Sequence, residues 1–273
     1  MGGAQTSVPA PPRTSLAGVD EAAHLLYYAS RERLLRRGIS MTDDGLRRLG
    51  RTRGLEGELA QGEYIAALLR AGELERNSVR LAAALGHPGA CAAEPDQVPF
   101  GVGPAETLVS PLAEADHEVY VLGAVRLSEA ALDTWQARFD DSRPAEILVA
   151  VRQWLEDPTP ANRVAVEATR EAAFPLSFDV FDLVEGEEQS AETFQAALAA
   201  LDVVLRTAQL VGSTSSWQSI QPLRALLASA FSALGVRADN HQNHVTVRPS
   251  SGAHRTLMIL SEALLPLLLP QVC

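Results

Sequence analysis

Three histidines near the C-terminus come closest to a metal site in residue type and spacing. His241 and His244 stand three residues apart, Asp239 precedes them and His254 follows. A His-x-x-His pair on a helix presents both imidazoles on one side, as zinc requires. Here the pair lies in a polar segment without a helical pattern, and no Glu separates the histidines as in a metalloprotease. We interpret the segment as a solvated loop, with a metal-dependent hydrolase as the alternative.

Other arrangements that could support catalysis are weaker. Asp116, His117 and Glu118 are consecutive, and on a helix neighbouring residues point about 100° apart, so the three side chains do not converge. Cys91 lacks a papain-like context, and no Gly-x-Ser-x-Gly elbow is present. Every basic residue is Arg, which excludes Schiff-base enzymes, phosphate-loop NTPases and protein kinases. The sequence favours a non-catalytic protein without a cofactor.

An acidic stretch from residue 179 to 188 is the candidate surface for a protein partner. We expect a solvated loop there, with two aromatic side chains tucked inward that could also serve as apolar anchors. A solvated loop without a partner is the alternative. The acids are Asp179, Asp182, Glu185, Glu187 and Glu188, and the aromatic residues are Phe178 and Phe181.

A cluster of arginines near the N-terminus forms a local basic patch, in contrast to the acidic stretch. Guanidinium groups suit carboxylate or phosphate partners, but arginines near helix ends also complement the helix dipole. The cluster could equally pair with the acidic stretch of the same chain. It comprises Arg31, Arg33, Arg36, Arg37, Arg47, Arg48, Arg51 and Arg53, opposed locally by Glu32, Asp43 and Asp44.

Charge and cysteine content limit the partners and the compartment. The formal net charge of −11 repels phosphate backbones, so we expect no general nucleic-acid binding. Cys91 and Cys273 form no disulfide framework, and residues 1–18 lack the apolar core of a signal peptide. The most apolar run, 257–269, is too short to span a bilayer. These features predict a cytoplasmic protein without a membrane span.

The composition predicts an all-α fold. Apolar residues make up 47% of the 273 residues but aromatics only 5%, so Ala, Leu and Val must form the core. We expect at least about 60% helix, against a base rate of about one third. The architecture should be an irregular bundle or short superhelix of about nine helices arranged as α-hairpins. The predicted organisation is a tail (1–18), an N-terminal helical part (19–93), a linker (94–107) and a C-terminal helical domain (108–273).

Capping and breaking residues predict the helix boundaries. Gly86 should end a helix that starts near residue 74. Ser110 and Pro111 should begin a long helix reaching about 139. A tight turn at 157–160 should join two helices into a hairpin. Further helices are expected at about 20–37, from 42, at 55–69, 190–211 and 220–234, and at the C-terminus. A polar linker at 213–219 and a small β-hairpin around Val245 and Val247 complete the prediction.

Two segments resemble uncharacterised helical proteins of high-GC bacteria, including a group assigned as immunity proteins of polymorphic toxin systems. One runs from Val79 to Ala90, and the other from Trp135 through Arg143-Pro144, Trp154-Leu155 and Asp157-Pro158-Thr159-Pro160 to Asn162-Arg163. The resemblance covers about a third of the chain and rests on packing and turn residues, so it carries over no catalytic residue. It implies a protein-binding module with an inhibitor or immunity function; a structural or regulatory scaffold would have the same sequence features.

Overall fold

The structure is a computed structural model, and it describes residues 57–97, 99, 106–182, 191–213, 216–238, 245–247, 249–270 and 272. The chain divides into two compact units, Met1–Met41 and Thr42–Cys273, and every described residue belongs to the second unit. The predicted tail, the helices expected at 20–37 and from 42, and the arginine cluster lie outside the described residues.

The described part of the chain is 83% helical, which confirms the predicted all-α class. A pair of three-residue antiparallel strands, β1 (Val236–Ala238) and β2 (Val245–Val247), forms the small hairpin, with Val236 opposite Val247. The helices are α3 (Gly57–Ala71), α4 (Arg76–Ala84), α5 (Pro88–Ala93), α6 (Glu106–Glu114), α7 (His117–Gln136), α8 (Arg143–Glu156), α9 (Pro160–Ala173), α10 (Leu176–Asp182), α11 (Ala191–Gly212), α12 (Ser216–Gly235) and α13 (Pro249–Leu268).

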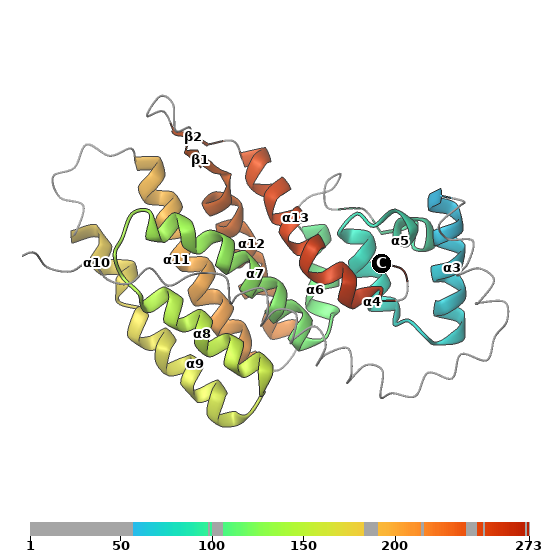
Figure 1. Ribbon diagram of the computed structural model, residues 1–273, viewed down its shortest axis with the longest axis horizontal. Coiled ribbons are helices and arrows are strands. Elements are labelled where there is room, and N and C mark those ends of the chain that lie inside the picture. The colour runs from blue at the N-terminus through green and yellow to red at the C-terminus, as the bar shows by residue number, and fades with distance from the viewer. Residues whose placement is uncertain are drawn as a thin grey trace, which may run out of the picture. The chain divides into compact units, whose positions relative to one another are not determined.

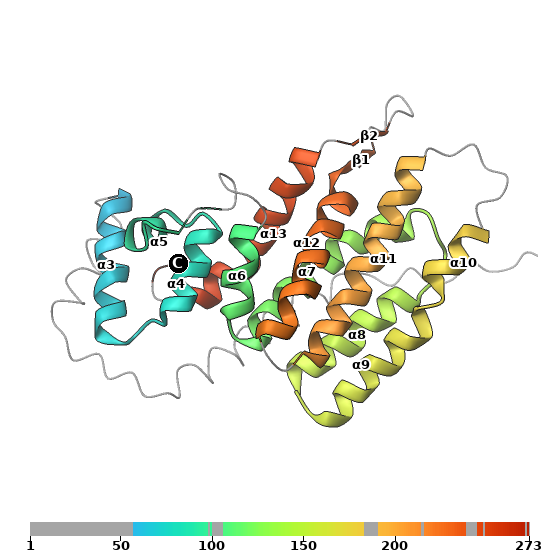
Figure 2. The same ribbon diagram turned by 180° about the vertical axis from the view of Figure 1, so that it is seen from behind.

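The centre of this unit is the packing of α11 against α7, α8 and α12. In Figure 1, α11 lies behind α7 and α8, and in the reverse view of Figure 2 it lies in front of them. Helix α7 buries Leu127 and Ala131, and α11 buries Ala200, Leu201 and further small or branched residues along its length. Because alanine carries only a methyl group, such faces let helix axes approach closely while still excluding water.

Helix α11 also has the length and hydropathy of a membrane span. Among the described residues it is the helix with an 18-residue window long and apolar enough to cross a membrane. Within the structure, 61% of that window is buried by the neighbouring helices. A core helix satisfies the same criterion, so length and composition alone do not separate the two uses of such a helix.

Gly86 ends α4 as predicted. Its φ of +85° is the left-handed conformation that glycine adopts without penalty, and the His87 amide donates back to Ala82 O at 3.0 Å. Pro88 then begins another helix, α5, which the sequence did not predict. His87 Nδ1 accepts from Ala90 N at 3.2 Å, and burial lowers the pKa of His87, which favours the neutral ring that can accept.

The predicted long helix from Ser110 to about residue 139 is wrong. Pro111 lies inside α6, and the break falls at Ala115–Asp116 instead. A proline cannot donate to the carbonyl four residues earlier, here that of Thr107. The Gln97 side-chain amide donates to Thr107 O at 3.3 Å, so this carbonyl keeps a partner and α6 continues through the proline.

One further boundary differs from the prediction. Residues 216–219, expected in a polar linker, form the first turn of α12, and α13 begins at Pro249. The predicted linker, 94–107, lies between α5 and the first residues of α6. Helix α4 packs on α6 and α13, and Ser261 Oγ donates to Leu85 O at 3.2 Å. The two sides of that segment therefore share one hydrophobic core.

Candidate partner-binding surface

The α8–α9 hairpin leads into the candidate partner-binding surface, which starts at the first residues of the acidic stretch. These two helices pack along each other, as predicted, and the turn between them is held by side chains. Thr159 Oγ1 accepts from Asn162 N at 3.3 Å, and Asn162 Nδ2 donates to Asp157 O at 2.8 Å. Pro160 occupies the first helical position, where its missing N–H costs nothing. The hairpin is followed directly by α10, which packs against α11.

Two phenylalanines project outward where α9 ends and α10 begins: Phe174 directly follows α9, and Phe178 lies in α10. Leu176 and Val180, four residues apart, are buried and anchor α10. Phe174 and Phe178, also four residues apart, lie on the other side with 50% and 64% of their surface exposed. Their ring centroids are 5.7 Å apart at an interplanar angle of 71°, an edge-to-face arrangement. We call Phe174, Phe178, Glu171 and Asp179 the aromatic corner; its helices can be followed in Figure 1.

Arg143 connects three elements beside the aromatic corner. Its Nη2 and Nε donate to the Asp141 carboxylate at 2.8 and 3.1 Å, and its Nη1 donates to Ala172 O at 3.3 Å near the end of α9. The hydrogen bonds from Arg143 hold the pKa of Asp141 below its usual range. Asp141 chiefly, and Asp179 and Glu146 to a smaller extent, raise the pKa of Arg143.

A second arginine beside the aromatic corner, Arg170 on α9, is also held by a carboxylate. Arg170 donates through Nε and Nη2 to Glu167 one turn earlier, which lowers the pKa of Glu167 and raises that of Arg170. Glu171 adds to the field at Arg170. Two guanidiniums therefore interact with five carboxylates on α8, α9, α10 and the residues just before α8, so the formal charge of this group is negative. The carboxylates are Asp141, Glu146, Glu167, Glu171 and Asp179.

The structure corrects the expectation for the acidic stretch. Residues 179–182 belong to α10 rather than to a loop, because Leu176 and Val180 make an apolar pair at helical spacing. Phe178 points outward, not inward as predicted, while Asp179 is exposed as expected. Only the backbone of Phe181 and Asp182 is described, and Glu185, Glu187 and Glu188 lie outside the described residues.

Sequence reasoning missed Phe174, which forms the aromatic pair with Phe178. Its signal was present, since Phe174 and Phe178 have the i, i+4 spacing of neighbours on a helix. The intervening Pro175 indicates the end of a helix, and Ala173 is indeed the last residue of α9. Pro175 O accepts from the amides of Phe178 and Asp179, so the chain resumes helical turns at once.

His117 has a packing role in this structure. It is the first residue of α7, and its Nε2–H donates to Leu210 O, a carbonyl near the end of α11, at 2.9 Å. Its ring lies 5.0 Å from that of Tyr120 and 5.1 Å from that of Trp154. Asp116 and Glu118 are exposed, so the three consecutive residues do not converge, as predicted. His117 thus connects α7, α8 and α11.

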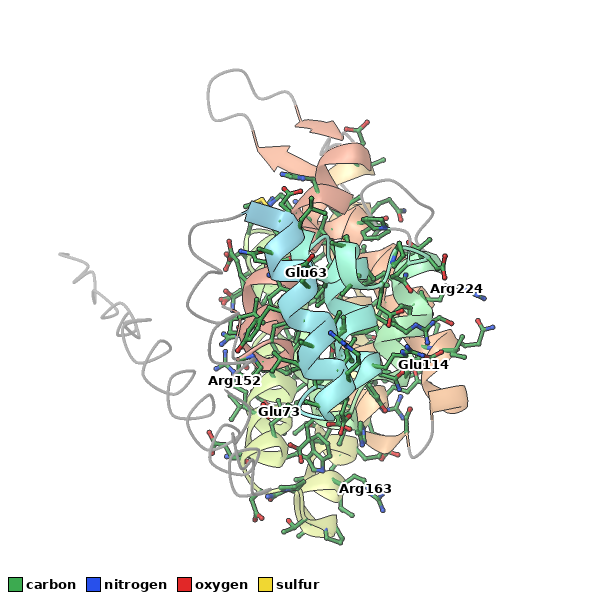
Figure 3. The ribbon with its side chains drawn as sticks, turned by 90° about the vertical axis from the view of Figure 1, so that its right-hand side faces the viewer. Glu63, Glu73, Glu114, Arg152, Arg163 and Arg224 are labelled. Carbon is green, nitrogen blue, oxygen red and sulfur yellow. The ribbon has the colours of Figure 1, made fainter. Side chains whose placement is uncertain are left out.

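The other candidate residues are dispersed or outside the described residues. His254 is exposed on α13, whereas His241 and His244 are not described; within the described ranges no group of three His, Cys, Asp or Glu could hold a metal. Burial raises the pKa of the Cys91 thiol, which donates to Ala83 O at 3.4 Å. Figure 3 shows charged side chains spread over the outside of several helices, among them Glu63 on α3 and Arg163 on α9.

Comparison of the chain with family models, curated proteins and solved structures gives no match. The properties of the aromatic corner therefore rest on its own geometry: two exposed rings in edge-to-face contact, with the exposed acids Glu171 and Asp179 close to them in sequence.

Proposed function

We propose that this chain is a non-catalytic protein-binding module that acts as an inhibitor or immunity-type partner of a basic protein. The observation that carries the proposal is the exposed aromatic pair of Phe174 and Phe178, whose rings are in edge-to-face contact. Exposed apolar side chains that lie together mark sites of protein contact, and aromatic anchors dominate the energy of many protein interfaces.

Charge supports a basic partner. The chain carries a formal net charge of −11, and opposite fields speed the association of two proteins and orient their encounter. Helical stacks also present rigid surfaces whose shape is set before binding, which lowers the entropy lost on association. An inhibitor needs this combination, because it must find its target quickly and cover it without doing chemistry.

The proposed contact surface extends from the aromatic corner along the acidic stretch. Phe178 and Asp179 begin it, and the later side chains of the stretch would continue it with further negative charge and one more aromatic ring. These are Phe181, Asp182, Glu185, Glu187 and Glu188.

Affinity capture with the purified full chain tests the proposal. The wild type should recover a specific basic protein, first to be sought in the product of the neighbouring gene, because immunity proteins are encoded beside their toxins. A variant with Asp179→Asn, Asp182→Asn, Glu185→Gln, Glu187→Gln and Glu188→Gln should recover less of it. Recovery of no specific protein by the wild type contradicts the binding function. Equal recovery by both proteins removes the acidic stretch from the interface.

A further inference from the structure

We propose that the aromatic corner is the docking site for an arginine-bearing segment of a protein partner, whose guanidinium lies over the Phe174 and Phe178 rings. This inference rests on the proposed binding function and identifies Phe174 and Phe178 as the apolar anchor of the interface. The corner provides the two features that a guanidinium needs, an accessible aromatic surface and nearby carboxylates.

The rings offer a preformed aromatic surface. Half or more of the surface of each phenylalanine is exposed, and the edge-to-face contact between the rings holds both in place. A guanidinium stacks on such a surface and is attracted by the negative faces of the rings. Phenylalanine has few rotatable bonds, so little side-chain freedom is lost when a partner covers the pair.

The surrounding charge selects a cation. Arg143 and Arg170 are each held by a carboxylate of their own, Asp141 and Glu167 respectively. Glu171 and Asp179 are exposed and contribute to the field at these two arginines. An incoming arginine therefore meets more acids than the corner neutralises itself, whereas an acidic segment is repelled.

Exposure alone does not distinguish this corner, which makes a matched control available. Val164 on α9 is 68% exposed, more than either phenylalanine, but its side chain is aliphatic and offers no ring face to a cation. Glu63 on α3 and Glu118 on α7 are exposed acids outside the aromatic corner. Substitutions at these positions change apolar surface or total charge without changing the corner.

The experiment measures binding of a fluorescein-labelled, arginine-rich amphipathic peptide to the full-length protein by anisotropy. A peptide with glutamate at every arginine position is the negative probe. Phe174→Ser with Phe178→Ser should weaken binding at least about tenfold, or about 1.4 kcal/mol, and Val164→Ser should leave it unchanged. Glu171→Gln with Asp179→Asn should weaken binding more than Glu63→Gln with Glu118→Gln, which removes the same charge. Circular dichroism of each variant verifies the fold.

Three results would overturn the docking site. The first is equal binding by the wild type and the double serine variant. The second is a loss of affinity in Val164→Ser equal to that in the double serine variant. The third is an equal loss of affinity in Glu171→Gln with Asp179→Asn and in Glu63→Gln with Glu118→Gln. Either of these two results indicates non-specific attraction. The proposed function fails by a different readout, the absence of any specific protein in affinity capture. A partner captured equally by the wild type and the double serine variant would leave that function standing and remove the aromatic corner from it.

Discussion

Ser128 Oγ and Thr207 Oγ1 lie 2.7 Å apart in the core, where they join α7 to α11. Both residues are fully buried. Each hydroxyl oxygen also lies 2.9 Å from a carbonyl one turn earlier in its own helix, Ser128 from Ala124 O and Thr207 from Val203 O. Because each hydroxyl has a single proton, one of them donates to its carbonyl and accepts the hydrogen bond from the other. A buried polar pair of this kind is satisfied only when the two helices are in one register, so it specifies how α7 and α11 align.

Replacing Thr207 with valine should destabilise the protein. The substitution keeps the shape but removes a hydroxyl that bonds both to Ser128 and to the backbone, at a cost of about 1 kcal/mol or somewhat more. The measurement is urea unfolding followed by far-ultraviolet circular dichroism. Thr256→Val is the matched control, because Thr256 is equally buried but its Oγ1 has no hydrogen-bond partner among the described residues. That variant should be neutral or more stable, and an equal loss in both would contradict the role of the pair.

Gly62 should not tolerate a methyl group. A Cβ at this position would lie 2.6 Å from the Cβ of Ala92, where α3 crosses α5. Overpacking of this kind typically costs about 1–3 kcal/mol, of which the better helix propensity of alanine offsets up to about 1 kcal/mol. We expect Gly62→Ala to lower the midpoint of urea unfolding. A Cβ at Gly212 would meet no described atom within 4 Å, so Gly212→Ala should leave the midpoint unchanged or raise it.

Stability should fall in acid partly through Asp141. Its pKa lies below the ordinary value near 3.8 because Arg143 binds the ionised form. The pair therefore stabilises the fold at neutral pH, and this contribution is lost as the pH falls through the folded-state pKa. Both side chains are about one third exposed, so solvent limits the effect to less than about 1 kcal/mol.

The corresponding measurement compares the wild type with Asp141→Ala across pH. The variant should be less stable at pH 7, and the difference should shrink at pH values well below 3.8 as the wild-type carboxylate is protonated. Asp140→Ala, at the neighbouring exposed residue, is the control for the loss of one acidic side chain. A constant difference between wild type and Asp141→Ala at every pH would mean that the Arg143 contact is not its source.

Purified protein should contain no stoichiometric zinc. The motivation is the polar sequence around His241 and His244, which lacks a helical pattern and has no Glu between the histidines. Elemental analysis of protein prepared without chelators measures this directly. Zinc at one equivalent, lost on His244→Ala but not on His117→Gln, would instead favour a metal-dependent hydrolase. His117 is the appropriate control because its ring nitrogen already bonds the carbonyl of Leu210.

The helical content, the stop at Gly86 and the α8–α9 hairpin could be predicted from sequence alone. Each depends on a local preference: alanine and leucine for helix, glycine for the left-handed conformation, and Thr159 with Pro160 for a helix start. These preferences act within a few residues, so no distant contact is needed to realise them.

Tertiary structure decided the features that depend on distant residues. Pro111 remains inside α6 because Gln97, which precedes that helix, donates to Thr107 O, the carbonyl to which proline has no N–H to donate. Phe178 points outward because Leu176 and Val180 take the buried side of α10, and the aromatic corner exists because Phe174 meets Phe178 there. A pattern of residue types shows that a helix has two faces. Which face becomes buried depends on the helix that packs against it, because burial is a property of the pair.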